Sequence, residues 1–247
     1  MLRMNHLSKV YRTHLIETHA LRDFSIHVRE GEFVAVTGPS GSGKTTFLNI
    51  AGLLETFSGG EFFLDGVDVR GLDDNARSRL RNAKLGVIFQ GFNLIPDLNL
   101  FDNVDVPLRY RGFNAAQRKR RIEESLTRVG LASRMKHYPS ELSGGQQQRA
   151  AIARALAGSP RLLLADEPTG NLDSLMARGV MELLEEINRQ GTTIIMVTHD
   201  PELAARAQRN VHVMDGQVTD LDDEPRLRQP QEAAPARREA TATGVTA

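Results

Sequence analysis

The sequence of 247 residues contains no cysteine, and aromatic residues make up only 5% of it. Without cysteine the protein has neither a disulfide framework nor a cysteine-ligated zinc site, which is compatible with a reducing compartment. Charge of one sign is not in excess either, because 31 basic residues balance 31 acidic ones. The net charge of zero therefore gives no support for bulk electrostatic binding to nucleic acid.

Long apolar runs are missing as well. No stretch approaches the ~18 consecutive apolar residues that are needed to span a bilayer. The longest apolar runs, 162–165 and 194–197, have the length of buried strands. The first residues include Arg3, His6 and Lys9 and no apolar core, so a signal peptide is not expected. If the protein works at a membrane, it must do so through a partner.

What is present suits one large domain, or one domain with an inserted subdomain. The hydrophobic share of 40% and the charged share of 25% are ordinary for a globular protein with a buried core. The predicted strands are 33–36, 85–89, 162–166 and 193–198, and the predicted helices are 45–54, 146–158 and 174–190. This alternation favours an α/β fold with a mostly parallel sheet that is covered on both faces.

The N-terminal side is β-rich rather than alternating. Segments 2–7 and 20–28 have the composition of strands, and Asp65-Gly66 is a turn signal inside a predicted hairpin at 61–69. We therefore expect a β subdomain beside the parallel sheet.

Residues 91–143 are predicted to form a helical subdomain that is inserted into the α/β core. Proline punctuates this stretch, and apolar residues recur at helical spacing over 115–131. From 222 to 247 the chain is polar and rich in Pro, Ala and Arg, so we expect a disordered tail there. The expected division is one domain over 1–221, with its core at 1–90 and 144–221, followed by the tail.

Gly38–Thr45 matches the pattern G-x-x-x-x-G-K-[ST] and lies between a predicted strand and a predicted helix. Backbone N–H groups in such a loop bind phosphate oxygens, and its glycines permit positive φ and close approach. Lys44 would reach the β- and γ-phosphates, and Thr45 would ligate Mg²⁺. A chance match is the alternative, and the flanking strand and helix speak against it.

Residues 161–167 form a predicted apolar strand that ends in two carboxylates. Asp166 can hold Mg²⁺ through water, and Glu167 can orient the attacking water or act as general base. A polar turn is the ordinary interpretation of such a pair. The phosphate loop upstream is what favours a function for both residues.

His199 and Gln90 also follow predicted strands. The C-terminal ends of parallel strands converge where ligands bind, which would put His199 beside Glu167 and near the γ-phosphate. Gln90 can reach the same place as a metal ligand or a group that orients water. Without the other motifs, both would be interpreted as ordinary turn residues.

Two features outside these segments have competing interpretations. Tyr11 lies in a polar setting after a strand-like segment, and its ring could stack on adenine or pack within a hairpin. The basic run Arg118–Arg121 could be offered as a nucleic-acid patch. It continues into Ile122-Glu123-Glu124 on a predicted amphipathic helix, so we expect a solvated helix face with salt bridges.

Leu142–Gln146 opens the predicted helix at 146–158. Ser143 can cap this helix and the two glycines bare its first amides, which makes a second anion-binding helix end. One phosphate loop already serves a γ-phosphate. The second helix end is therefore surplus unless it serves the nucleotide of another molecule, and a plain glycine-rich N-cap is the alternative.

Over roughly residues 1–220, these segments resemble the ATP-binding cassette (ABC) ATPases. The resemblance rests on the order and spacing of Gly38–Thr45, Gln90, Leu142–Gln146, Leu162–Glu167, Asn171-Leu172-Asp173 and His199. It implies a P-loop NTPase core with a mostly parallel sheet, an antiparallel β subdomain at the N-terminal side and an inserted α-helical subdomain. The segments 89–96, 102–104, 165–173 and 197–200 look like the bacterial branch of macrolide exporters, lipoprotein-release systems and the cell-division ATPase.

The resemblance also implies a head-to-tail homodimer, in which Ser143–Gln146 of one copy closes over ATP on Lys44 of the other. Asp173 lies in the segment that crosses the dimer interface in this family. The implied catalytic residues are Glu167, His199 and Gln90, and the implied Mg²⁺ ligands are Thr45, Gln90 and Asp166. The implied ATP-binding residues are Tyr11, Gly38, Pro39, Ser40, Gly41, Ser42, Gly43, Lys44, Thr45, Thr46, Ser143, Gly144, Gly145, Gln146 and Asp173.

In this branch the ATPase drives a conformational change in an integral-membrane permease. The resemblance therefore implies a cytoplasmic subunit that is peripheral on the inner face of the bacterial membrane. A soluble ABC-type ATPase that acts on nucleic acid or ribosomes is the alternative. Members of that class carry a long coiled coil before the signature or join two cassettes, and this sequence has neither pattern. A metabolic P-loop kinase would leave Leu142–Gln146 without a role.

Overall fold

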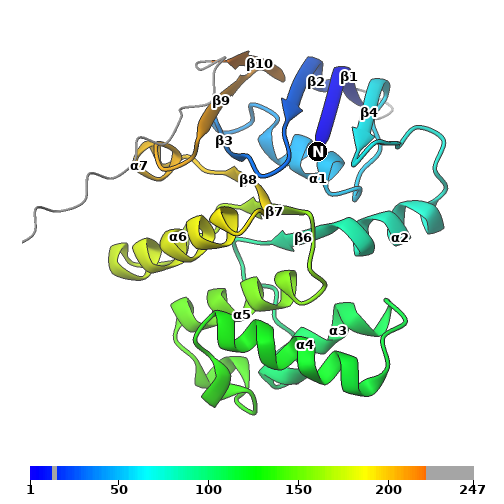
Figure 1. Ribbon diagram of the computed structural model, residues 1–247. Helices are drawn as coiled ribbons and strands as arrows, with labels where there is room; N and C mark the ends of the chain where they lie inside the picture. The colour runs from blue at the N-terminus through cyan, green and yellow to red at the C-terminus, as the bar shows by residue number, and fades with distance from the viewer. Residues whose placement is uncertain (13–15, 221–247) are drawn as a thin grey trace, which may run out of the picture.

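The computed structural model describes residues 1–12 and 16–220, so the expected tail at 222–247 lies outside the described residues. A six-stranded sheet crosses the molecule in the order β10-β9-β3-β8-β7-β6 (Figure 1). Its strands are β3 (Phe33–Thr37), β6 (Leu85–Ile88), β7 (Leu162–Asp166), β8 (Thr193–Val197), β9 (Arg209–Met214) and β10 (Gln217–Asp220). All neighbouring pairs except β9 with β10 are parallel, which confirms the α/β prediction.

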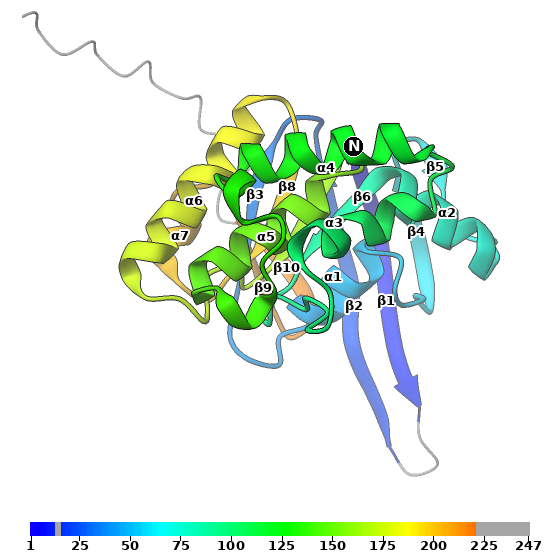
Figure 2. The ribbon, with the colours of Figure 1, turned by 90° about the horizontal axis from the view of Figure 1, so that it is seen from below.

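The second sheet is antiparallel and has the order β2-β1-β4-β5. Its strands are β1 (Leu2–Arg12), β2 (Glu17–Val28), β4 (Gly59–Leu64) and β5 (Val67–Asp68). Phe63 pairs with Asp68 across a tight turn, which confirms the predicted hairpin at 61–69. β1 and β2 extend beyond the body of the molecule as a two-stranded ribbon (Figure 2).

Helices and the antiparallel sheet cover the two faces of the six-stranded sheet. The α-helices are α1 (Lys44–Ala51), α2 (Asp74–Lys84), α3 (Leu100–Arg109), α4 (Ala115–Arg128), α5 (Gly144–Leu156), α6 (Ser174–Arg189) and α7 (Pro201–Ala204). Successive side chains of β3 point to opposite faces: Phe33 and Ala35 join the core shared with α5 and α6, and Val34 and Val36 join the core shared with α1. The sheet is therefore buried on both sides.

The predicted helical subdomain at 91–143 contains α3 and α4, which pack against each other and against α5 below the sheet in Figure 1. Ile122, Leu126 and Val129 are fully buried, because residues three and four positions apart share one helix face. Asn114 and Gln117 form a capping box at the start of α4. The apolar stripe on one face of α4 and the capping box at its start therefore explain why this segment forms a helix.

The basic run at the start of α4 forms salt bridges, as predicted. Arg120 Nε lies 2.7 Å from Glu124 Oε1, one helical turn further on. Arg118 instead reaches Asp105 on α3, where Nε lies 2.8 Å from Oδ1 of that buried carboxylate. Part of the run therefore joins two helices of the subdomain.

Several elements differ from the sequence-based expectation. α2 was not predicted, and its lack of any buried residue explains why the sequence has no apolar period there. The β9–β10 hairpin was also not predicted. α1 ends at Ala51 rather than at 54, and α5 begins at Gly144 rather than at 146. Across 1–12 and 16–220, no helix is both long and apolar enough to cross a membrane.

Candidate functional site

The loop between β3 and α1 takes a backbone shape that only glycine permits at two positions. Gly38 has φ 145° and Gly43 has φ 105°. A Cβ atom on Gly38 would lie 2.1 Å from the carbonyl oxygen of Val213, and one on Gly43 would lie 2.6 Å from that of Ala20. Positive φ and close backbone approach both exclude larger residues here. The loop is thus fixed by packing against β2 and β9.

Lys44 folds back over this loop. Its Nζ donates to the carbonyl oxygens of Gly38 at 2.8 Å and Pro39 at 2.7 Å, and the side chain is largely buried. The hydroxyl of Ser42 is buried and has no hydrogen-bond partner within the described part of the chain. An ammonium group and a free hydroxyl in one loop suit a phosphate ligand.

Asp166 ends β7 close to this ammonium group. Burial raises the pKa of Asp166 above its usual value, and the neighbouring Glu167 carboxylate raises it further. The charge of Lys44 acts in the opposite direction. Lys44 of the phosphate loop and the two carboxylates at the end of β7 therefore act on one another electrostatically.

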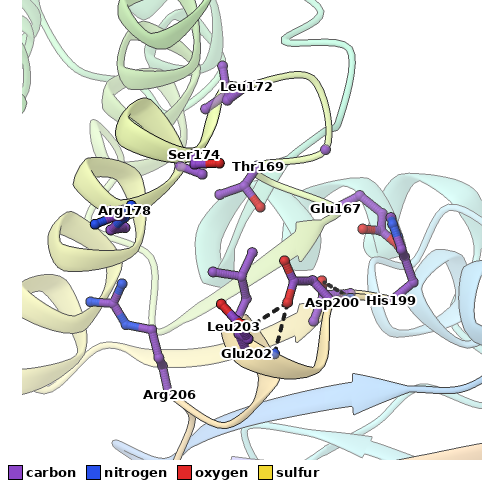
Figure 3. A pocket seen from close by; sticks show the side chains of 13 residues that line it. Glu167, Thr169, Leu172, Ser174, Arg178, His199, Asp200, Glu202, Leu203 and Arg206 are labelled. Atoms are coloured by element: carbon purple, nitrogen blue, oxygen red, sulfur yellow. Dashed lines mark hydrogen bonds and ion pairs between the residues drawn. The ribbon is translucent and has the colours of Figure 1, made fainter.

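Glu167 and His199 meet at the ends of two adjacent parallel strands. His199 Nδ1 lies 2.8 Å from Glu167 Oε1, and Figure 3 shows the two side chains next to each other. Glu167 has φ 45°, and its amide donates to the carbonyl of Val197 at 3.0 Å. The hydrogen bond to Glu167 is the main reason that the pKa of His199 is raised.

A cavity of about 620 Å³ opens beside this pair. Its walls come from the segment after β7, from the first turns of α6 and from α7 (Figure 3). Arg178 and Arg206 line the side of the cavity away from Glu167 and His199 (Figure 3), and Arg206 donates to Glu185. The cavity thus reaches Glu167 and His199 from the side of α6 and α7, and not through the phosphate loop.

The residues present fit a magnesium ion that is shared with a nucleotide. Thr45, Gln90 and Asp166 offer hydroxyl, amide and carboxylate oxygens, which are the donors that Mg²⁺ prefers. Within 1–12 and 16–220, no group of three or more His, Cys, Asp or Glu side chains could hold a metal. A site made of Thr45, Gln90 and Asp166 has few protein ligands, so it suits an ion that keeps water and phosphate ligands.

Gln90 follows β6 and contacts the segment after Glu167. Asn171 Nδ2 donates to the Gln90 carbonyl at 2.9 Å. A Cβ atom on Gly170 would lie 2.7 Å from Gln90 Nε2, so the amide packs directly on this glycine. The structure therefore places Gln90 against Gly170 and Asn171, in the segment that follows Glu167.

Ser143 caps α5 as predicted. Its Oγ accepts from the Gln146 amide at 3.4 Å, and Gln146 Oε1 accepts from the Ser143 amide at 3.1 Å. A Cβ atom on Gly145 would lie 2.8 Å from the sulfur of Met176, so glycine also lets α6 approach. Packing therefore accounts for part of the glycine requirement at this helix end.

The cap of α5 and the phosphate loop are separate in this chain. Figure 1 places α5 in the lower layer and α1 in the upper one. Among the residues that the structure describes, no hydrogen bond or ion pair joins 143–146 to 38–45. The starts of α1 and α5 are thus two helix N-termini that could each bind an anion, and they do not meet within one copy.

Tyr11 and Asp173 have local partners. Tyr11 lies near the end of β1 with 39% of its surface exposed, and Lys9 Nζ lies 4.7 Å from its ring centroid. Asp173 Oδ1 accepts from the amides of Leu175 and Met176 at 3.0 and 2.9 Å, and it caps α6. Neither residue joins the Lys44 loop by such a contact in the described structure.

Sequence reasoning missed one residue at this site. Arg154 on α5 donates to the carbonyl oxygens of Phe92 and Asn93, just after Gln90. An arginine in a helix that is otherwise rich in alanine was the available signal. Its contact with a loop 61 positions away could not be read from the pattern.

Comparison with known proteins gives a consistent result. The family model described as ABC transporter matches residues 21–170. The chain is 47% identical over 218 residues to the lipoprotein-releasing system ATP-binding protein LolD of Bordetella pertussis, covering 88% of this chain and 94% of that protein. It is 44% identical over 218 residues to the macrolide export ATP-binding/permease protein MacB of Brucella melitensis, covering 88% of this chain and 34% of that one.

A solved structure is also similar. The ATP-binding cassette MJ0796, in a dimeric post-hydrolysis state bound to ADP and Pi, matches with a TM-score of 0.83 and 39% sequence identity. The match covers 92% of this chain and 99% of that one.

Proposed function

The chain belongs to the ABC transporter family of ATPases, and from this premise we propose that two copies bind ATP between them and drive a separate membrane protein. The observation that carries the proposal is the Glu167–His199 pair beside the Lys44 loop. The pair gives a base and an orienting group, and the loop gives a phosphate site. What is missing from one copy is a second group of donors for the γ-phosphate.

In the proposed reaction, Glu167 accepts a proton from the attacking water. The water oxygen forms a bond to the γ-phosphorus while the bond from that phosphorus to the bridging oxygen of ADP breaks. His199 donates from Nδ1 to Glu167, which leaves its Nε2 for a phosphate oxygen. The raised pKa of His199 favours the protonated ring that can donate from both nitrogens.

The phosphate loop binds and orients the nucleotide. Lys44 already donates to two loop carbonyls, so its ammonium group lies over the space that the loop encloses. The backbone N–H groups of residues 40–46, in the loop and at the start of α1, would supply further donors. Tyr11 is proposed to stack on the adenine ring and thereby to position the base.

Thr45, Gln90 and Asp166 would hold Mg²⁺ together with the phosphates. The ion would neutralise charge that develops on the phosphate oxygens. Gln90 would in addition report nucleotide occupancy to the helical subdomain, since its main chain continues into residues 91–96. This assignment rests on the oxygen donors that the three side chains offer.

Ser143–Gln146 is proposed to complete the site of a second copy. Support comes from the separation of this segment from the phosphate loop within one copy, and from the similarity to MJ0796, whose structure is dimeric. Asp173 lies at the neighbouring start of α6 and would contact the partner copy. Two nucleotides would then hold two copies together in a head-to-tail dimer.

The proposed partner is an integral-membrane permease. MacB carries an ATP-binding part and a permease in one protein, and this chain matches about a third of that protein. A permease segment would dock near Gln90–Pro96, on the inner face of the bacterial membrane. Export, lipoprotein release and transmission of mechanical work are all compatible with this arrangement.

Copurification separates this proposal from the alternative of an ATPase that acts on nucleic acid or ribosomes. The tagged protein would be purified from detergent-solubilised membranes and from the soluble fraction of its native cells. Recovery of a stoichiometric membrane protein supports the proposal. Recovery of ribosomes or nucleic acid, with no membrane protein, would contradict it.

A further inference from the structure

The loop after Gln90 has two consecutive residues in the left-handed region, and their carbonyl oxygens share one side-chain partner. Phe92 has φ 59° and Asn93 has φ 49°, and neither is glycine. Consecutive left-handed residues with side chains are costly and persist only where the surroundings impose them. The contacts of this loop should therefore identify what imposes its shape.

Arg154 supplies those contacts from the opposite side. Its Nη2 donates to the Phe92 carbonyl at 2.9 Å, and its Nη1 donates to the Asn93 carbonyl. One planar guanidinium thus holds the two carbonyls of the left-handed pair, a geometry that the fixed fork of arginine suits. Within the described residues the side-chain partners of Arg154 are these two carbonyl oxygens and no carboxylate, and burial lowers its pKa. The two carbonyls are therefore the partners of a half-buried charge.

The same loop touches the opposite end of α5. The ring of Phe92 lies 3.7 Å from the position that a Cβ atom on Gly144 would take. Gly144 is the first residue of α5, and Arg154 lies in its last turn. The loop therefore contacts α5 both at its capped start and through the arginine near its end.

On its other side, the loop is tied to the segment that follows Glu167. Asn171 Nδ2 donates to the Gln90 carbonyl at 2.9 Å, and Gln90 Nε2 packs on Gly170. Residues 90–93 thus lie between α5 and the end of β7. A shift of α5 changes the position of Gln90 if the link through Arg154 is intact.

We propose that Arg154 is a positioning residue that couples α5, which carries the Ser143–Gln146 cap, to Gln90 at the hydrolysis site. The inference rests on the function proposed above. In the proposed reaction Arg154 contacts no substrate, and it acts through the loop at 90–93. Its role is to move Gln90 into place when the cap of α5 engages the nucleotide of a second copy.

The kinetic test compares Arg154→Gln with Arg149→Gln. Arg149 is on the same helix, but it donates to the carbonyls of Val129 and Gly179 instead of the loop. We expect Arg154→Gln to lower kcat by about 10- to 100-fold, as for a displaced reacting group. The KM for ATP should stay within about twofold, because the Lys44 loop is intact. Arg154→Lys should recover part of kcat, since an ammonium keeps the charge but lacks the fork.

Amide hydrogen exchange provides a readout that does not need ATP hydrolysis. In nucleotide-free protein, Arg154→Gln should speed exchange at residues 91–95, and Arg149→Gln should leave that segment unchanged. A wild-type rate of exchange and a wild-type kcat in Arg154→Gln would overturn the inference while leaving the proposed function intact. If the wild-type protein does not hydrolyse ATP but Arg154→Gln still speeds exchange at residues 91–95, the proposed function is contradicted. The structural link between Arg154 and the loop is retained in that case.

Non-additivity provides a second check on the same loop. Asn171→Ala removes the tie on the other side of Gln90. If both residues act by fixing one loop, the double variant should lose less kcat than the product of the two single losses. Independent, multiplicative losses would show that Arg154 does not act through this loop.

Discussion

His199 Nδ1 lies 2.8 Å from Glu167 Oε1, although the two residues are 32 positions apart in the sequence. The register of the sheet explains this, since Asp166 on β7 is paired with Val197 on the parallel strand β8. Both chain segments leave the sheet at the same edge, one or two residues before these side chains. The pairing is thus a property of strand topology.

This contact predicts the titration of His199. Because the hydrogen bond to Glu167 raises its pKa, the ring should titrate above the free value, and Glu167→Gln should shift the titration back down. Histidine resonances followed by NMR across pH would measure it, with His137 of the helical subdomain as the internal reference. An identical His199 titration in both proteins would mean that the contact does not form in solution.

The same shift fixes the sign of a stability effect. A pKa that is raised in the folded state means that folding favours the protonated ring. This contribution is complete below the unfolded pKa of about 6.5 and is lost as the pH rises through the folded pKa. Since most of the His199 side chain is exposed, solvent screens the effect. Thermal unfolding of wild type and Glu167→Gln should therefore differ only slightly, and more at low pH.

Lys44→Ala should weaken nucleotide binding. A hydrogen bond to a charged group contributes about 1.5–3 kcal/mol, so the Kd for ATP should rise by about 10- to 150-fold for each hydrogen bond to phosphate that the substitution removes. Calorimetric titration would measure it, with exposed Lys119→Ala as the control. A normal ATP affinity in Lys44→Ala would remove this lysine from the site.

Tyr11→Ala should weaken binding of the base without affecting the phosphates. Stacking of an aromatic side chain on a base is worth about 1–3 kcal/mol, so ATP affinity should fall while tripolyphosphate affinity stays the same. Tyr11→Phe should retain the affinity, because the ring does the stacking. Tyr110, which is 80% exposed on the helical subdomain, provides the control for loss of a surface tyrosine. Equal losses for ATP and tripolyphosphate would argue for a structural role of Tyr11 within its hairpin.

Complementation tests whether the cap of α5 works in the partner copy. Ser143→Arg removes the N-cap hydroxyl and adds bulk at the exposed start of α5. Alone, this variant and Lys44→Ala should each be inactive in ATP hydrolysis. Mixed together they should regain activity, because the nucleotide on the intact Lys44 then meets the intact Ser143 of the other copy. A mixture as inactive as its parts would contradict the head-to-tail arrangement.

The sequence predicted the elements that have strong patterns. β7 and β8 are short apolar runs beside glycine and charged turns, and α4 has a clear apolar stripe, so each was predicted close to its observed bounds. α2 was missed because all of its residues remain at least partly exposed. A helix of that kind leaves no period in the sequence.

The sequence predicted the proximity of site residues only where they follow the ends of adjacent parallel strands. Parallel strands bring Glu167 and His199 together whatever the side chains do, so their proximity follows from the order of the elements. The contact of Arg154 with the loop after Gln90 depends on the packing of α5 against that loop. Propensity and spacing contain no information on such a contact between distant segments.

We propose that ATP holds two copies of this chain together until Glu167 allows hydrolysis. Glu167→Gln keeps the size of the side chain and removes the base. Size-exclusion chromatography with light scattering would measure its mass with and without ATP and Mg²⁺, and Glu167→Gln combined with Lys44→Ala would serve as the control. We expect Glu167→Gln to be a dimer only with ATP, and the control to stay monomeric. A Glu167→Gln variant that binds ATP and remains a monomer would rule out the proposed ATP-dependent dimer.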